Sequence, residues 1–391
     1  MTPLAPIHGY VVAPAVADEV VAPPYDALTP EERNRHVETH PRSFLSVLPE
    51  AEYTTGPTLD AARARLHELI TEGVFEPHPE PFVAIYRLIE GSHAQTGLVA
   101  AVPAEWGLAG RIRAHEATRP DRVEQLVMFL ERVGVASSPV SLAFRDHTDL
   151  VDAIAVATRG EPDVSVDDGD VAQHVWIVEE PGPLLAAGSE VERLYITDGH
   201  HRTAAALAHT SGPGGIEAPL LSVLFPAEEL RLVDYHRVLE EPDVGLEELV
   251  ATLRAADWEV EPLDGIRAPR ERRELVAVDR EGAWVARIPE RDVGDDPVGH
   301  LDVARFHDEI LGAVLGVDDV RSHPGLRFIA GDKGIGALAE AVTGSEAIGF
   351  ALHPPAMDEL MDVADAGAVM PPKSTYFTPK VRSGLFLRFL G

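Results

Sequence analysis

A strand-like run, a glycine and an alanine-rich run follow one another at residues 191–210 of this 391-residue chain. The run VERLYI contains β-branched and aromatic residues and is typical of a strand. The run TAAALA consists of strong helix formers, and Gly199 between the two allows a sharp turn. The sequence therefore predicts a strand–turn–helix unit, and the first amides of such a helix attract anions.

The predicted turn carries an unusual set of polar residues: Asp198, Gly199, His200, His201, Arg202 and Thr203. A planar guanidinium beside helix amides suits a phosphate group. We expect His200, His201 and Arg202 to converge on such a group. Asp198 either caps the helix or holds a cation. The alternative is a simple capped turn, but a cap alone does not need two histidines and an arginine in succession.

The composition excludes several classes of function. The chain has no cysteine, which rules out disulfides, thiolate metal sites and cysteine nucleophiles. Its formal net charge of −32 repels phosphate backbones and argues against nucleic-acid binding. The first residues do not read as a secretory signal, and no apolar run is long enough to span a membrane. We therefore expect a cytoplasmic protein with no nucleic-acid or membrane partner.

A second polar cluster, HEATRPDR, lies before a strongly amphipathic run. We expect Thr118 to cap the helix, which leaves His115 and Glu116 on the preceding loop. A carboxylate in this position can act as a general base, so Glu116 is our first choice for that role. Arg119 or Arg122 is the expected anion contact, His115 is a further candidate for phosphate binding, and Thr118 is also an expected substrate contact. The alternative is the ordinary charge found at helix ends.

A third cluster, APPYD, contains two prolines that stiffen its loop. Tyr25 is an expected substrate contact, and Asp26 is our second choice for the base. The alternative is a plain turn before the next helix. That helix is predicted to begin at Thr29, because TPEE forms a capping box with proline in the first helical position.

A fourth cluster spans residues 370–380, MPPKSTYFTPK. Lys373, Ser374 and Lys380 suit the binding of a phosphate or carboxylate; an exposed turn is the alternative. Of the chain's 33 basic residues, only Lys333, Lys373 and Lys380 are lysines. Chance is the simpler explanation, and the other is a need for a compact ammonium, since lysine and arginine are not interchangeable.

Helical and extended patterns are mixed along the whole chain, which predicts an α+β protein. The sequence EEPDVG at 240–245 suggests a boundary. We expect a phosphate-binding domain at residues 1–242 and a second α+β domain at residues 243–391. The last strand, predicted at 384–390, is assigned to the second domain.

Six segments in order resemble the family of domain of unknown function 1015: VAPPYDALTPEE, HPRSFLSV, HEATRPDR, ITDGHHRTAAAL, FPAEELRLVDYHRV and MPPKSTYFTPKVRSGL. The DGHHR block also resembles that of ParB/sulfiredoxin-like proteins, particularly the kinases that phosphorylate free L-serine. This resemblance implies a ParB/sulfiredoxin-like N-terminal domain with a mixed sheet, in which residues 198–202 bind phosphate. Sulfiredoxin chemistry needs a cysteine and DNA clamping opposes the charge, so phosphoryl transfer remains.

The function expected from these observations is small-molecule phosphoryl transfer, with L-serine or O-phosphoserine as the expected substrate of a kinase, phosphotransferase or phosphatase. Lys373 and Ser374 would close the site from the second domain. Mg²⁺ is the expected cofactor, with ligands that the sequence does not identify. The phosphoryl donor, the direction of reaction and a homodimeric state are left open. The alternative is a non-catalytic protein that binds a nucleotide or a phosphorylated metabolite for regulation; a purely structural role leaves residues 198–202 without a purpose.

Overall fold

The computed structural model describes residues 2–25, 28–49, 55–211 and 219–390. It has the predicted α+β character and divides into two compact units. Unit 1 comprises residues 1–230 and 379–391, and unit 2 comprises residues 231–378. This division differs from the predicted boundary at 242, since the end of the chain returns to unit 1. Within the described ranges, the helices are too short or too polar to cross a bilayer.

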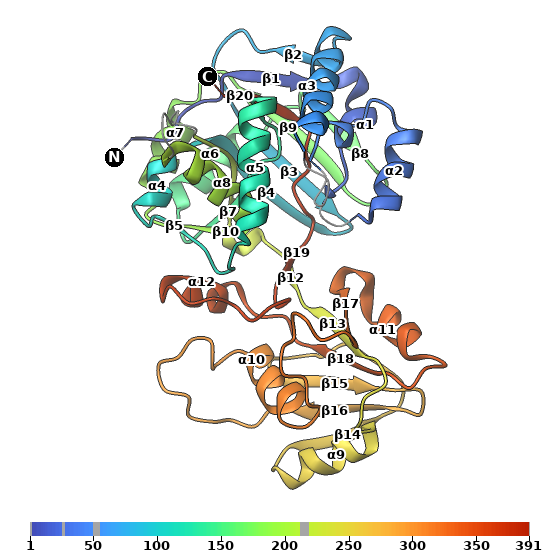
Figure 1. Ribbon diagram of the computed structural model, residues 1–391. Coiled ribbons are helices and arrows are strands. Elements are labelled where there is room, and N and C mark those ends of the chain that lie inside the picture. Colours follow the sequence, from blue (N-terminus) through green and yellow to red (C-terminus); the bar gives the residue numbers. More distant parts are fainter. Residues whose placement is uncertain (1, 26–27, 50–54, 212–218, 391) are drawn as a thin grey trace. The chain divides into compact units, whose positions relative to one another are not determined.

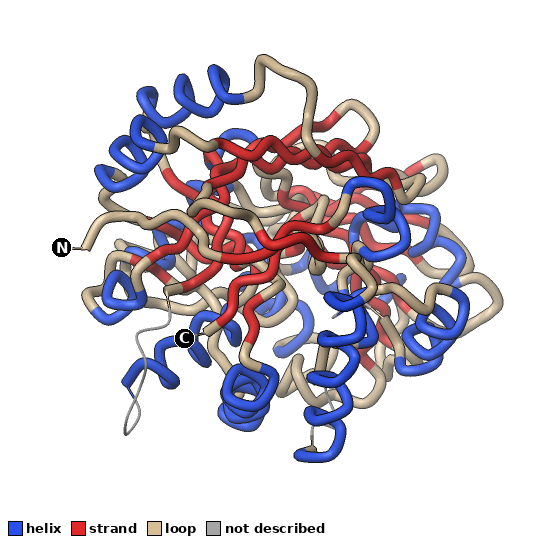
Figure 2. Tube along the Cα trace, turned by 90° about the horizontal axis from the view of Figure 1, so that it is seen from above, coloured by secondary structure: helices blue, strands red, loops and turns tan. Residues whose placement is uncertain are grey.

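Unit 1 contains two sheets with helices on their outside (Figures 1 and 2). The larger sheet has the order β5-β10-β7-β11-β4-β3-β9-β8, and the smaller has the order β2-β1-β20-β6. The strands are β1 (Gly9–Val12), β2 (Phe75–Pro77), β3 (Val83–Glu90), β4 (His93–Val102), β5 (Ile112–Arg113), β6 (Val135–Ala136), β7 (Val140–Phe144), β8 (Val164–Asp167), β9 (Ala172–Val178), β10 (Leu194–Asp198), β11 (Leu220–Pro226) and β20 (Phe386–Phe389).

The larger sheet is mixed. β10 runs parallel to β5 but antiparallel to β7, and β7 runs parallel to β11. The helices of unit 1 are α1 (Ala17–Val20), α2 (Pro30–Thr39), α3 (Gly56–Thr71), α4 (Ala104–Leu108), α5 (Pro120–Val133), α6 (Thr148–Ala157), α7 (Gly182–Glu190) and α8 (His200–Ser211). The predicted capping box at Thr29 is confirmed: its hydroxyl accepts from Glu32 N–H, and the Glu32 carboxylate accepts from Thr29 N–H.

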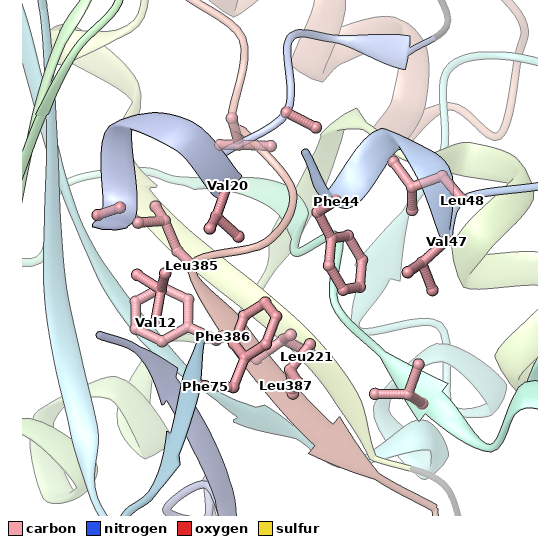
Figure 3. Packing of buried hydrophobic residues seen from close by; sticks show 14 of the residues in the cluster. Val12, Val20, Phe44, Val47, Leu48, Phe75, Leu221, Leu385, Phe386 and Leu387 are labelled. Carbon is pink, nitrogen blue, oxygen red and sulfur yellow. The ribbon is translucent and has the colours of Figure 1, made fainter. Parts of the chain in front are cut away.

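The chain's last strand completes the smaller sheet of unit 1. β20 pairs with β1 on one side and with β6 on the other. Its apolar residues Phe386 and Leu387 are fully buried in a core that also contains Phe44 and Phe75 (Figure 3). Burial of each large apolar side chain contributes roughly 1.5–3 kcal/mol. Unit 2 is therefore inserted, along the sequence, into unit 1.

Unit 2 has a sheet of order β14-β16-β15-β18-β13-β17 and a short pair, β12–β19. Its strands are β12 (Leu232–Val233), β13 (Tyr235–Leu239), β14 (Glu259–Leu263), β15 (Glu274–Val278), β16 (Ala283–Arg287), β17 (Leu326–Ala330), β18 (Ile348–Leu352) and β19 (Tyr376–Phe377). Its helices are α9 (Leu246–Ala255), α10 (Asp302–Phe306), α11 (Gly334–Val342) and α12 (Met357–Asp365). Helix α10 continues into a π-helical turn at His307–Gly312.

Candidate functional site

The predicted strand–turn–helix unit is present in unit 1. β10 ends at Asp198 and α8 begins at His200, with Gly199 between them at φ 97°. A Cβ atom on Gly199 would lie 3.0 Å from Nε of Arg202, so a side chain here would press on Arg202 in addition to straining the backbone. The Thr203 N–H and hydroxyl both donate to the Gly199 carbonyl, at 2.9 and 3.1 Å. The amides before Thr203 therefore form the N-terminal end of the helix.

Arg202 ties this turn to the segment that leads into β7. Its guanidinium donates to the carbonyls of Ser138 and Pro139, at 2.9 and 2.5 Å, and to the Asp198 carboxylate. The side chain is only 17% exposed. The hydrogen bonds of Arg202 are thus made within the protein, and they stabilise the turn.

Asp198 faces two cations. Besides Arg202, the Lys380 ammonium lies 3.7 Å from the second carboxylate oxygen. Burial alone would raise the pKa of Asp198, but the charges of Arg202 and Lys380 outweigh it and lower that pKa below its usual value. Two cations therefore face this one carboxylate at the start of α8.

His200 packs beneath the loop that precedes α5. Its ring lies edge-on against His115, with centroids 4.5 Å apart, and its Nδ1 is 3.7 Å from the Glu116 carboxylate. His200 is 6% exposed, and within the described chain its Nε2 makes no hydrogen bond. Burial, with the charges of His201 and Arg202, lowers the pKa of His200 to about 3. Burial also lowers the pKa of His115, with His200 adding to the effect. Both rings are therefore neutral at pH 7.

His201 contacts the same loop as His200 but at a different residue, Arg119. Its Nε2 accepts a hydrogen bond of 3.0 Å from the Arg119 backbone N–H. Arg119 is the N-cap residue of α5, and the expectation that Thr118 caps this helix is wrong. Burial, followed by the charges of Arg119 and Arg122, lowers the pKa of His201 and keeps Nε2 available as an acceptor. Thr118 lies exposed on the loop.

The structure brings the two main sequence clusters together but does not make the side chains converge. His200 contacts the His115–Glu116 loop, His201 contacts Arg119, and Arg202 points to Ser138 and Pro139. Consecutive helical residues point about 100° apart, so these three cannot all face one group. The expected side-chain clamp is corrected to a turn whose side chains hold the neighbouring segments in place.

The remaining predicted site residues are placed as follows. Tyr25 is half-buried and lines a cavity of about 70 Å³ together with Arg202. Asp26 lies outside the described residues. Lys373 and Ser374 belong to unit 2, where Lys373 is exposed and the Ser374 hydroxyl donates to the Pro371 carbonyl.

The cavity is lined mostly by apolar residues, including residues of α5 and α8. Leu126 and Phe129 contribute from α5, and Ala205 and Ala206 from α8. The small side chains of the alanine-rich helix leave this space open. Ser137 also lines it, is 3% exposed, and has no hydrogen-bond partner for its hydroxyl in the described protein. The start of α8 thus has a space beside it for a small group.

The expected Mg²⁺ has no evident binding site among the described residues. No group of three or more histidine, aspartate or glutamate side chains there has the geometry to hold a metal ion. Asp198, the carboxylate at the turn, directs its two oxygens at Arg202 and Lys380. We assign no step to a metal ion.

Sequence reasoning missed two contributions to the site. The carbonyls of Ser138 and Pro139 accept from Arg202, and backbone acceptors leave no mark on a sequence. Lys380 was expected to bind an anion, but its pairing with Asp198 joins residues far apart in the chain. The cluster at residues 370–380 and the restriction of lysine to three positions indicated Lys380, but neither indicates its partner.

The buried neutral state of His200 makes stability depend on pH. The unfolded chain protonates His200 near pH 6.5, whereas the folded pKa is about 3. The unfolded state therefore binds more protons between these values, and His200 lowers stability as the pH falls from 6.5 to 3. We expect His200→Asn to reduce the slope of unfolding free energy against pH by up to about 1.4 kcal/mol per pH unit in this window. Urea unfolding at several pH values measures this slope. The control is His67→Asn, a substitution at an exposed position. Equal slopes in wild type and His200→Asn would contradict the assignment.

Comparison with known proteins gives a family but no curated relative. A free serine kinase in complex with AMP is 14% identical, with a TM-score of 0.36 and coverage of 73% of this chain and 91% of that chain. SbnI with a C-terminal truncation, from Staphylococcus aureus, is 13% identical, with a TM-score of 0.39 and coverage of 73% and 85%. A conserved hypothetical protein from Pyrococcus furiosus is 14% identical, with a TM-score of 0.35 and coverage of 74% and 95%. No curated protein matches significantly. A family model matches residues 4–304, and the chain belongs to that family, protein of unknown function (DUF1015).

Proposed function

We propose that unit 1 binds a phosphoryl group at the start of α8 and transfers it to or from the hydroxyl of a small molecule. The observation that carries the proposal is the turn at Gly199. There, the amides at the start of α8 lie close to two cations, Arg202 and Lys380, which both face Asp198. Helix N-termini with local positive charge bind phosphate groups. The sequence resemblance of this block to the phosphate-binding turn of free L-serine kinases makes L-serine and O-phosphoserine the first compounds to test.

The reaction needs a group that takes the proton of the attacking hydroxyl. In the kinase direction, the hydroxyl oxygen forms a bond to phosphorus, the bond to the donor's leaving oxygen breaks, and the proton passes to a carboxylate. Glu116 is the group we assign to that step. Its side chain is 59% exposed and lies beside His200 at the start of α8. Asp26 remains the second candidate from the sequence.

One observation favours a second function, the binding of a phosphorylated ligand without catalysis. His201 and Arg202 are occupied by contacts that shape the turn, and binding needs only the helix amides and the nearby cations. A regulatory protein would use the same site and would not need Glu116.

The direct test incubates the purified full chain with L-serine and ATP or ADP, and separately with O-phosphoserine, in the presence of Mg²⁺. We expect ³¹P NMR to show transfer or release of the phosphoryl group. Isothermal titration with O-phosphoserine and inorganic pyrophosphate measures binding in parallel. Binding without turnover would favour the regulatory function. If the protein shows no binding and no turnover, both proposed functions are refuted.

A further inference from the structure

Lys373 has a backbone conformation that its residue type does not favour. Its φ is 55°, in the left-handed region where glycine is normally found. A non-glycine residue there costs roughly 1–2 kcal/mol. Three of the chain's 33 basic residues are lysines, so this position has one of the chain's few ammonium groups. A side chain is retained here although glycine would suit the backbone better, which indicates a use for the side chain.

A buried charge pair holds the backbone of Lys373. Arg237, on β13, is fully buried and donates a hydrogen bond of 2.9 Å to the Lys373 carbonyl. The same guanidinium donates to the Asp234 carboxylate at 2.5 Å and to the Tyr235 carbonyl. Arginine is suited to this task because its donors form a fixed planar fork. The carbonyl of an exposed loop residue is thus fixed from inside the unit.

The buried ion pair of Asp234 and Arg237 is an expensive way to stabilise the fold. Asp234 is 4% exposed, and burial raises its pKa to about 6 despite the charge of Arg237. The Nε of Arg237 is buried without a hydrogen-bond partner in the described protein. Apolar residues of similar volume often stabilise a core as well as such a pair does. The specific gain from Arg237 is its contact with the Lys373 loop.

The ammonium of Lys373 rests on an aromatic platform. Its Nζ lies 5.1 Å from the centre of the Tyr235 ring, which is within cation–π distance. Tyr235 packs edge-on against Tyr376 with centroids 5.6 Å apart, and Tyr376 pairs with Val233 across β12–β19. Lys373 is exposed, and no carboxylate of the described residues forms an ion pair with it. Its charge is therefore directed to solvent from a fixed position.

We propose that Lys373 is an anion-contacting residue of unit 2 and that Asp234 and Arg237 are positioning residues which fix it. The ligand class is a phosphate-type oxyanion, since a lysine ammonium binds phosphate as a point charge. The proposal rests on the proposed function only for the choice of phosphate. Its own evidence lies entirely within unit 2.

The small number of lysines allows a direct experiment on the full chain. Reductive methylation with ¹³C-formaldehyde keeps the charge and labels Lys333, Lys373, Lys380 and the α-amine, which single Lys→Arg variants assign. Inorganic pyrophosphate is the probe. We expect the Lys373 signal to shift in a saturable way. Lys333, exposed in the same unit, is the internal control, and its signal should shift much less. Equal shifts at the two lysines would overturn the proposal.

Three variants separate positioning from simple structure. Lys373→Gly removes the left-handed strain and should raise the midpoint of thermal unfolding by about 3 °C. Arg237→Lys should weaken the Lys373 response at least tenfold and leave Lys333 unchanged. If that variant does not fold, Tyr235→Leu removes the platform without touching the charge pair and should weaken the response too. A lower midpoint of thermal unfolding for Lys373→Gly would overturn the proposal. So would a Lys373 signal that responds to pyrophosphate as in wild type in the folded Arg237→Lys or Tyr235→Leu variants.

The same spectra distinguish this proposal from the proposed function. Lys380 reports on the turn at Asp198 in unit 1, and Lys373 reports on unit 2. A shift at Lys373 without one at Lys380 would support the site in unit 2 and count against phosphate binding at α8. A shift at Lys380 alone would refute the site in unit 2 and leave the site in unit 1 intact.

Discussion

Arg202→Ala is expected to lower the free energy of unfolding by about 3 kcal/mol, because it breaks a largely buried ion pair and removes two further hydrogen bonds. The substitution leaves Asp198 with Lys380 as its only cation among the contacts described above, at 3.7 Å. It also leaves the carbonyls of Ser138 and Pro139 without this donor. Urea unfolding measures the loss.

The control for this prediction is Arg119→Ala on the facing loop. The Arg119 side chain is 68% exposed and pairs with Asp121 at 3.7 Å. Exposed ion pairs contribute about 0–1 kcal/mol, so the variant should remain close to wild type. We expect the double variant Arg202→Ala with Asp198→Ala to lose less than the sum of the two single losses, because the unpaired carboxylate is gone. Equal, small losses for Arg202→Ala and Arg119→Ala would contradict the structural role.

Glu116→Gln is expected to reduce turnover by about 10²- to 10⁴-fold while phosphate binding is retained. This range is typical for the loss of a general base. The amide has nearly the same shape but cannot take a proton from a hydroxyl. Binding should not weaken, because the substitution removes a negative charge near the anion site. Steady-state kinetics on the compound found in the activity test, together with isothermal titration, measure the two effects.

The matched control is Glu124→Gln, an exposed carboxylate on α5, which should leave both quantities unchanged. If Glu116→Gln turns over normally, the base lies elsewhere, and Asp26→Asn becomes the next variant. If binding falls in parallel with turnover, Glu116 serves the shape of the loop beside His200 and takes no part in proton transfer.

The elements of this fold were largely predictable where the signal is local. The capping box at Thr29 starts a helix as expected, and the strand–glycine–helix pattern around Gly199 is present at the predicted place. The assignment of the last strand to the second domain failed for a physical reason. β20 is an ordinary apolar strand, and only its pairing with β1 across the length of the chain places it in unit 1.

The site was predictable as a set of residues but not as a geometry. The HEATRPDR and DGHHR clusters do meet, through His200 with Glu116 and His201 with Arg119. Which group each side chain contacts depends on tertiary partners. A histidine from α8 accepts the N–H of Arg119, the N-cap residue of α5, and this contact joins segments far apart in the sequence. The helical angle between successive residues already argued against three converging side chains.

The return of the chain to unit 1 has a consequence for the order in which the protein is made. Residues 1–230 leave the ribosome without the strand that fills the gap between β1 and β6 and without Lys380, the second cation beside Asp198. The inserted residues 231–378 are synthesised next and can fold first as a unit of their own. The nascent N-terminal part must therefore wait with an open sheet edge, the kind of surface on which chaperones act, until translation supplies residues 379–391.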